Sequence, residues 1–362
     1  MEQLLKLQDV CIAKTSNITQ NSLSNENGEY PIYGASGLIK NIGFYQQDKE
    51  YIAIVKDGSG VGRVSLHPAY SSVIGTMQYI IPDNNIIDTK FLFHYLKHLN
   101  LSKYSVGMAI PHIYFKDYKN EALNVPSLEI QKEKSKTLDN LVKLIDIKEQ
   151  ILKKYDNLVK SQFIEMFGDP DLSQQKESWD ELENVGEIVG GSTPKTSIKE
   201  YWDGDLNWFT PAEIKENDFI VNQSERKITE LGAKSCSLRK MPINTVILSS
   251  RAPIGKVALA GCEFYCNQGF KNIVCNENLN PIFLLMLLKY NNEYLNSLGR
   301  GATFKEISKT IVSKIKIPTP PIELQNQFAD FVKHIDKLKF TLKEEIKKLQ
   351  ECYNSLMKEY FE

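Results

Sequence analysis

Two stretches of about forty residues contain neither glycine nor proline, and they constrain the fold most strongly. They begin after Pro126 and Pro321 and are rich in Lys, Glu, Leu and Ile. Apolar residues recur in them every seven positions, which is typical of coiled-coil helices. The first row comprises Leu138, Ile145, Leu152, Val159 and Met166, and the second comprises Ile335, Leu342, Leu349 and Leu356.

The same pattern predicts how these helices end and how long they are. Proline is compatible with the first turn of a helix, and Gly168-Asp169-Pro170 predicts the end of the first helix. At a rise of ~1.5 Å per residue, forty residues would span roughly 60 Å.

A seven-residue repeat needs a long partner with the same repeat, and within this chain each helix is the other's candidate partner. We therefore predict antiparallel pairing rather than packing of each helix on its own globular part alone. The residues predicted to pair are Leu138, Ile145, Leu152, Val159, Ile335, Leu342, Leu349 and Leu356.

The two helical stretches belong to an internal duplication. Pro126-Ser127-Leu128-Glu129-Ile130-Gln131 resembles Pro320-Pro321-Ile322-Glu323-Leu324-Gln325, with Glu129 and Glu323 194 positions apart. Further echoes occur in the same order in both halves, such as Val61-Gly62-Arg63-Val64 and Ile254-Gly255-Lys256-Val257. The period is far too long for a solenoid, so the chain is predicted to contain two copies of one unit.

Each copy is predicted to consist of a globular domain followed by a long helix. The predicted boundaries are 1–124, 125–168, 175–318 and 319–362. Short apolar runs predict strands at Tyr51–Val55, Gln78–Ile81, Thr245–Leu248 and Asn272–Val274, and helices are expected near Thr89–Leu99 and Pro281–Tyr290. The expected fold is α+β, with two globular domains joined by two long antiparallel coiled-coil helices in a pseudo-twofold arrangement.

Two motifs indicate a family. Gly191-Ser192-Thr193-Pro194-Lys195 leads into Tyr201-Trp202-Asp203-Gly204-Asp205-Leu206-Asn207-Trp208-Phe209-Thr210-Pro211, which resembles the opening of target recognition domains in specificity subunits of type I restriction–modification systems. Tyr30-Pro31-Ile32-Tyr33-Gly34-Ala35-Ser36-Gly37-Leu38-Ile39 resembles a second variant of that opening. The first domain departs from the Tyr-Trp version, which implies that the two domains read different half-sites.

The resemblance implies a sequence-specific DNA recognition subunit. Each globular domain would read one half of a bipartite double-stranded DNA site, and the coiled coil would set the gap. Methylation subunits, usually two copies, and restriction/translocase subunits would bind this chain. Methyl transfer from S-adenosylmethionine would occur on the methylation subunits, so this chain would need no cofactor and would not be an enzyme.

Simple geometry agrees with that expectation. Two half-sites on one face of DNA lie about 34 Å apart, or a multiple of that distance. A stiff helical pair of the predicted length could hold two reading domains at such a spacing. A pseudo-twofold arrangement of reading domains would also match the twofold geometry of duplex DNA.

Composition excludes some classes and leaves DNA binding open. The chain has 362 residues and a formal net charge of −1, so local basic clusters or partner subunits would have to supply a positive field. No apolar run has the length of a membrane span or a signal peptide, and we expect a cytoplasmic protein. The six cysteines are expected to be free thiols, because the cytosol is reducing, and the paired spacing of a zinc site is missing.

Polar and basic residues in turns and loops are the candidate DNA contacts. The turns after two predicted strands end in Arg63 and Lys256, and the densest basic run contains Arg300, Lys305, Lys309, Lys314 and Lys316, opposed locally by Glu306. A solvated face is the alternative for that run. The predicted DNA-binding residues are Arg63, Gln78, His112, Lys116, Thr193, Lys195, Arg251, Lys256, Lys271, Arg300, Thr303 and Lys305.

Candidate catalytic features have simpler explanations. Asn280-Pro281-Ile282-Phe283 is close to the N-P-P-F/Y motif of amino-methyltransferases but lacks the second proline, so we expect it to open a helix. Gly58-Ser59-Gly60-Val61-Gly62 is expected to form a tight turn rather than a nucleotide loop. His94 and His98, without an acidic ligand nearby in sequence, are expected to be surface or packing residues, and no catalytic or metal site is predicted.

Two other functions stay open at this point. One is a DNA methyltransferase or nuclease with fused recognition domains. The other is a coiled-coil adaptor that makes no contact with DNA.

Overall fold

The computed structural model describes residues 3–107, 111–215, 218–251, 253–301 and 305–362. The chain forms two compact units. Unit 1 comprises Met1–Gln150 and Lys343–Glu362, and unit 2 comprises Ile151–Leu342. Because each unit contains part of both long helices, these units do not test the domain boundaries predicted above, which remain predictions.

The first globular domain, in unit 1, combines short strands with one longer helix. Its helices are α1 (Leu7–Val10), α2 (Thr89–His98) and α3 (Phe115–Tyr118), with 3-10 turns at Asn21–Leu23 and Leu101–Tyr104. Its strands are β1 (Gln3–Lys6), β2 (Cys11–Thr15), β3 (Tyr30–Gly34), β4 (Gly37–Ile42), β5 (Tyr51–Val55), β6 (Val64–His67), β7 (Ser72–Val73), β8 (Met77–Pro82) and β9 (Ala122–Val125).

The second globular domain, in unit 2, has the same kinds of elements. Its helices are α5 (Leu182–Val185), α6 (Glu230–Ser235), α7 (Pro281–Tyr290), α8 (Asn292–Ser297) and α9 (Lys309–Ser313), with 3-10 turns at Leu172–Gln174 and Lys199–Tyr201. Its strands are β10 (Asp180–Glu181), β11 (Gly186–Gly190), β12 (Trp202–Phe209), β13 (Ile220–Val221), β14 (Lys227–Ile228), β15 (Val246–Leu248), β16 (Val257–Ala260), β17 (Tyr265–Cys266), β18 (Lys271–Cys275) and β19 (Lys316–Ile317).

The strand orders show that the two domains are copies of one fold. The central antiparallel sheet runs β2-β8-β5-β6 in the first domain and β11-β18-β15-β16 in the second, where β13 adds a parallel edge strand. A smaller sheet runs β4-β3-β7 and β14-β12-β17, each with one antiparallel and one parallel pair. A two-stranded sheet, β1-β9 or β10-β19, closes each domain. The predicted duplication and the α+β class are therefore confirmed.

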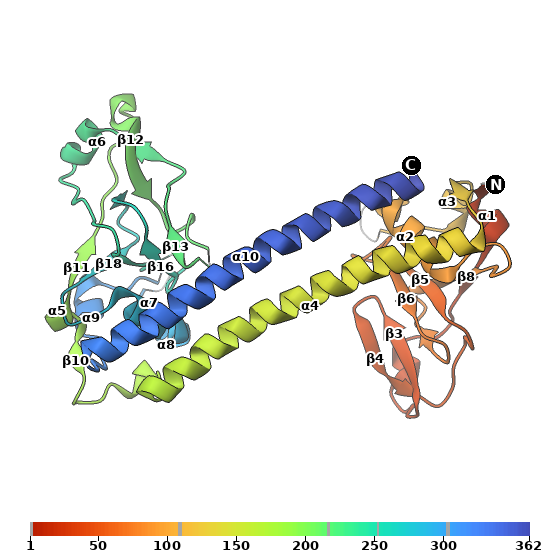
Figure 1. The fold of residues 1–362 in the computed structure, drawn as a ribbon, viewed down its shortest axis with the longest axis horizontal. Coiled ribbons are helices and arrows are strands. Elements are labelled where there is room, and N and C mark those ends of the chain that lie inside the picture. The colour runs from red at the N-terminus through yellow and green to blue at the C-terminus, as the bar shows by residue number, and fades with distance from the viewer. Residues whose placement is uncertain (1–2, 108–110, 216–217, 252, 302–304) are drawn as a thin grey trace. The chain divides into compact units, whose positions relative to one another are not determined.

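The two long helices are α4 (Leu128–Phe167) and α10 (Ile322–Phe361), each 40 residues long (Figure 1). Their first residues are 194 positions apart, as the repeat predicts. Gly168 ends α4 with a backbone φ of +83°, a conformation that glycine adopts without steric cost.

Contacts within each unit show that α4 and α10 run antiparallel. In unit 1, Lys148 of α4 pairs with Glu345 of α10 at 2.8 Å, and the ammonium of Lys134 lies over the ring of Tyr360. In unit 2, Asp156 of α4 pairs with Lys339 of α10. Because residue numbers fall on one helix as they rise on the other, the pairing is antiparallel, as predicted.

The eight residues predicted to pair across the helices are all buried or half-buried. The neighbouring row differs, since Leu144 and Leu158 are exposed. This burial supports the predicted seam, which remains a prediction at the level of individual contacts.

Each long helix begins against its own globular domain and ends against the other. Phe361, at the end of α10, packs on Phe91 of α2 at 5.1 Å between ring centroids. Phe167, at the end of α4, packs on Phe283 of α7 at 4.8 Å. Each unit is thus completed by the far end of the helix that follows the other domain.

A buried glutamine fixes the start of each long helix. Gln131 Oε1 accepts from Asp88 N at 2.7 Å, and its Nε2 donates to Ile86 O and Pro126 O. Gln325 repeats this set with Asn280 N, Asn278 O and Pro320 O. The glutamine of the repeated Pro-x-x-Glu-x-Gln segment therefore ties each helix to the turn that precedes α2 or α7.

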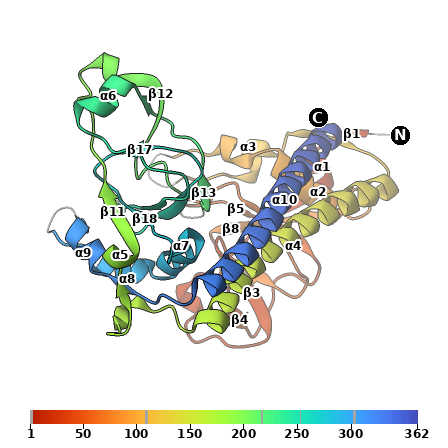
Figure 2. The same cartoon turned by 60° about the vertical axis from the view of Figure 1, so that its left-hand side comes forward.

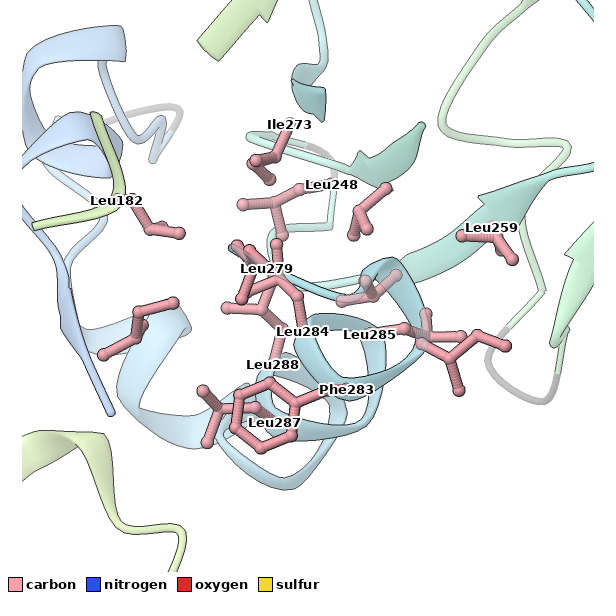
Figure 3. Close-up of a cluster of buried hydrophobic side chains, with 14 of the residues drawn as sticks. Leu182, Leu248, Leu259, Ile273, Leu279, Phe283, Leu284, Leu285, Leu287 and Leu288 are labelled. Carbon is pink, nitrogen blue, oxygen red and sulfur yellow. The ribbon is translucent and has the colours of Figure 1, made fainter. Parts of the chain in front are cut away.

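The core of unit 2 surrounds α7. Side chains of α7, among them Leu284, Leu285 and Leu288, lie beside Leu248 and Ile273 of the central sheet (Figure 3). The smaller sheet that contains β12 lies at the opposite end of the domain from α7, next to α6 (Figures 1 and 2). The helix therefore supports the central sheet, and the smaller sheet stands clear of it.

Candidate nucleic-acid interface

The turn between β5 and β6 presents Arg63. Gly58 and Gly62 have φ values of +94° and +83°, and a Cβ on Gly62 would lie 2.5 Å from Ser102 N. The glycines thus form a tight turn between strands, as predicted. Arg63 is exposed, and its Nη1 donates to Ala35 O at 2.9 Å. The guanidinium is therefore held at the surface above the loop between β3 and β4.

The equivalent turn of the second domain holds its basic residues more closely. Lys256 is half-buried, and its Nζ donates to Pro211 O at 3.0 Å, while Ser249 Oγ accepts from its backbone N–H. Arg251 is half-buried and forms a backbone bridge with Glu306. Contact of Arg251 and Lys256 with DNA remains a prediction. Arg63 is more exposed than either of them.

Two of the predicted contact residues are buried within their domains. Gln78 donates to Tyr118 Oη at 2.7 Å. Lys271, at the matching position on β18, donates to Ser250 Oγ and pairs with Glu306 at 3.1 Å. Their residue types suggested contact with DNA bases, but hydrogen bonds within the protein engage both side chains. We therefore remove Gln78 and Lys271 from the candidate contacts.

Matching loops follow the central helix of each domain. The backbones of Val106 and His112 form an isolated antiparallel β-bridge in the first domain, and those of Arg300 and Glu306 form one in the second. Lys116 is exposed, with its ammonium 5.2 Å from the ring of Tyr114, and Arg300 and Lys305 are also exposed. Thr303 lies outside the residues that the structure describes. These loops keep their place as candidate contacts.

The basic run of the second domain is less free than its sequence indicated. Lys314 pairs with Glu181 and Glu183, both at 2.7 Å. Besides the local Glu306, two carboxylates distant in sequence therefore oppose this run, from β10 (Glu181) and α5 (Glu183).

The Gly191–Lys195 loop lies over two tryptophans. Trp208 Nε1 donates to Ser192 O at 3.1 Å, and Trp202 Nε1 donates to Lys195 O at 3.3 Å. Both indoles are buried. Lys195 is exposed, whereas Thr193 is half-buried and donates to Gln268 Oε1 at 2.6 Å.

Arg226 belongs to this surface and was missed from the sequence. Its guanidinium lies 3.9 Å from the centroid of the Trp202 ring and 5.3 Å from that of Trp208. Arg226 follows Trp202 by 24 positions, and no local pattern connects them. Their contact arises because β12 pairs with β14, which begins directly after Arg226.

The catalytic and metal candidates take structural roles. Asn280 caps α7, and its Oδ1 accepts from Ile282 N and Phe283 N, so the Asn-Pro segment opens a helix as expected. His94 is buried, and its Nε2 lies 2.9 Å from Asp139 Oδ1 of α4. This acidic partner is distant in sequence, and the role of His94 is one of packing, as expected.

The described residues include neither a cluster of metal ligands nor a membrane-spanning helix. Within the described residues, no group of three or more His, Cys, Asp and Glu side chains could hold a metal ion. All six cysteines are free thiols, as predicted. No helix in the described part of the chain is long and apolar enough to cross a membrane.

A buried histidine makes the first domain sensitive to pH. His67 is buried beside Tyr51, with its Nε2 2.8 Å from Ser65 Oγ, and burial lowers the pKa of His67 to about 4. The unfolded chain therefore binds this proton at a higher pH than the folded chain does. The contribution of neutral His67 to the free energy of unfolding is therefore present above a pH of about 6.5 and is lost as the pH falls towards 4.

Because of His67, we expect the free energy of unfolding to fall by about 2 kcal/mol when the pH is lowered from 6.5 to 5. Urea unfolding of wild type and His67→Gln at both pH values measures it, and the variant should lose about 2 kcal/mol less than wild type. The same substitution at the exposed His334 is the control. Equal losses in wild type and His67→Gln would contradict the assignment.

Comparison with known proteins identifies the family. The family model described as type I restriction modification DNA specificity domain matches residues 3–155 and 176–351. The specificity subunit of the type I restriction enzyme MjaIX from Methanocaldococcus jannaschii is 36% identical over 209 residues, covering 56% of this chain and 48% of that protein. The MjaVIII specificity subunit from the same organism is 26% identical over 335 residues, covering 84% and 77%. This chain thus spans about half the length of the first relative.

Solved structures share the fold. The S subunit of a type I restriction–modification system from M. genitalium has a TM-score of 0.65 at 16% identity and covers 100% of this chain and 96% of its own. A second structure, of a type I R-M system complex, has a TM-score of 0.55 at 16% identity, covering 99% and 97%. The duplicated family match and the duplicated fold agree, and the chain belongs to the family of type I restriction–modification DNA specificity domains.

Proposed function

We propose that this chain is the sequence-reading subunit of a type I restriction–modification complex. Each globular domain reads one half of a split double-stranded DNA site, and the paired helices α4 and α10 set the gap between the halves. The two domains share one strand order but differ in the loops they expose, and this combination supports the proposal most strongly. A shared fold supports the same docking on DNA, and different loops support different base sequences.

The loop chemistry of the two domains illustrates this difference. In the segments that flank the smaller sheet of the first domain, Tyr45 and Tyr70 are exposed, and their ring centroids are 5.2 Å apart. The equivalent sheet of the second domain carries Arg226 on its two tryptophans. Aromatic and guanidinium groups make different contacts with base edges, so the half-sites are expected to differ.

We propose further that the chain does no chemistry of its own. The amide oxygen of Asn280, the residue closest to a methyltransferase motif, is engaged as a helix cap. Methylation subunits, in two copies, would bind this chain and carry S-adenosylmethionine and the methyl transfer. Restriction/translocase subunits would join that core. The complex would act on chromosomal DNA in the cytoplasm.

Exchanging one globular domain tests the proposal. Residues 1–124 are replaced by the corresponding domain of a relative with a known half-site, with α4 and α10 kept intact, and the host methylome is sequenced. We expect one half of the methylated site to change completely, while the other half and the gap stay as in wild type. A matched exchange of 175–318 should change the opposite half.

The same experiment distinguishes the alternatives. An unchanged methylated sequence after both exchanges would support an adaptor without DNA contact and would contradict the proposal. Methyl transfer by the purified chain alone would instead support a methyltransferase with fused recognition domains.

A further inference from the structure

Arg226 has an unusual setting for an exposed arginine. Its guanidinium lies over the Trp202 ring, and the two indoles meet edge to face at 5.0 Å with an interplanar angle of 86°. A guanidinium that stacks on an aromatic ring loses rotational freedom but keeps its N–H edges available. Arg226 therefore presents a planar set of donors in a fixed orientation.

The backbone beneath Arg226 is fixed as well. Ser224 is buried, and its Oγ donates to Arg226 O at 2.6 Å and accepts from Trp208 N at 3.0 Å. Asn207 Oδ1 accepts from Ser224 N, and Glu213 Oε2 accepts from Glu225 N. These bonds tie the segment before β14 to β12 and to the loop that follows it.

Among the described residues, the guanidinium donors of Arg226 have no acceptor. In the described part of the chain, no carboxylate lies within ion-pair distance of its guanidinium, and its side chain makes no hydrogen bond. Arg239, another exposed arginine of unit 2, pairs with Glu187, and its neighbour Lys240 pairs with Glu263. Arg226 is thus oriented as a binding residue would be, and none of the described residues accepts a hydrogen bond from it.

The charge around Arg226 favours base readout over phosphate binding. Glu225, next to it in sequence, and Asp203 and Asp205, on the paired strand β12, are exposed, against the cations Arg226 and Lys227. A phosphate contact needs mainly a positive field, which these three carboxylates oppose. A base edge needs donors and acceptors at defined positions, and a guanine offers O6 and N7 to one planar fork.

We propose that Arg226 reads a guanine in the half-site of the second domain, with the Trp202–Trp208 pair as its support. The inference rests on the proposed DNA-recognition function and deepens it. The indole pair sets the plane of the guanidinium, and Ser224 sets the position of its backbone. Arg226 is therefore a specificity-determining residue, and the tryptophans are positioning residues.

The test uses the full-length chain assembled with its methylation subunits and a pool of duplexes with randomised sequence. Wild type, Arg226→Ala and Arg226→Met are compared, and the methionine keeps an apolar cover over Trp202. Arg239→Ala is the control, because it removes the same charge from an exposed arginine of the same unit. Tryptophan fluorescence and thermal unfolding show whether each variant keeps the indole pair in place.

We expect both Arg226 variants to lose the guanine preference at one base pair of the second half-site. Their affinity for the wild-type site should fall about 5- to 100-fold, while the other positions stay as in wild type. Arg239→Ala should match wild type within about twofold. Folded Arg226 variants that weaken all sequences equally, or that leave affinity and preference unchanged, would overturn the proposal. A wild-type complex that selects no split site would instead refute DNA recognition itself.

Discussion

Replacing Gln131 with leucine is expected to lower the unfolding free energy of unit 1 by about 3–5 kcal/mol. The side chain is buried and makes three hydrogen bonds, to Asp88 N, Ile86 O and Pro126 O. Leucine has a similar size but leaves these three backbone groups without a partner. Each buried unsatisfied group costs about 1–3 kcal/mol, less whatever water can restore.

Hydrogen exchange measures this effect at the affected bond. The amide of Asp88 donates directly to Gln131 Oε1, so its protection should fall in Gln131→Leu. Urea unfolding followed by circular dichroism gives the change in stability. Gln325→Leu should have the same effect on unit 2, because Gln325 makes the matching three bonds.

The control for this pair is Gln150→Leu on α4. Gln150 is exposed, and its Nε2 bonds only to Asp146 one turn earlier. We expect this variant to stay within about 0.5 kcal/mol of wild type. Equal losses at Gln131 and Gln150 would show that the buried glutamine does not fix the helix to its domain.

Much of the fold was predictable because its signals are periodic or repeated. The heptad rows predicted α4 and α10, and α7 has the predicted bounds, Pro281–Tyr290. The repeated Pro-x-x-Glu-x-Gln segment predicted the duplication, and the structure explains its glutamine, which makes the same three bonds in both copies. Periodic burial and repeated turns depend on neighbours close in sequence, which a sequence displays directly.

The candidate interface was less predictable because it depends on contacts between distant residues. Gln78 and Lys271 have the chemistry of readout residues, yet Tyr118 and Glu306 engage them from other parts of the fold. Arg226 meets Trp202 only through strand pairing. Residue type shows what a side chain can bind, whereas its partners within the fold decide whether it is available.

Replacing Phe163 with alanine is expected to destabilise unit 2 by about 3–5 kcal/mol. Phe163 lies on α4, which follows the first domain, yet it is buried in unit 2 among rings of other elements. It stacks on Phe283 of α7 at 5.5 Å with an interplanar angle of 11°, and meets Phe328 of α10 edge to face at 5.3 Å. Alanine would leave a cavity at the point where these three helices meet.

Ile164 provides the matched control, because it is the next residue on the same helix and is 45% exposed, against 1% for Phe163. Ile164→Ala should cost less than about 1 kcal/mol in urea unfolding. In Phe163→Ala, hydrogen exchange should show faster opening of amides in α7 than in α2, whose helix-end contact is made by Phe361 of α10. Equal effects on α7 and α2, or a loss no larger than that of Ile164→Ala, would contradict the reciprocal packing. The two long helices are thus expected to be needed for the stability of the domains they reach, in addition to any role in setting the gap.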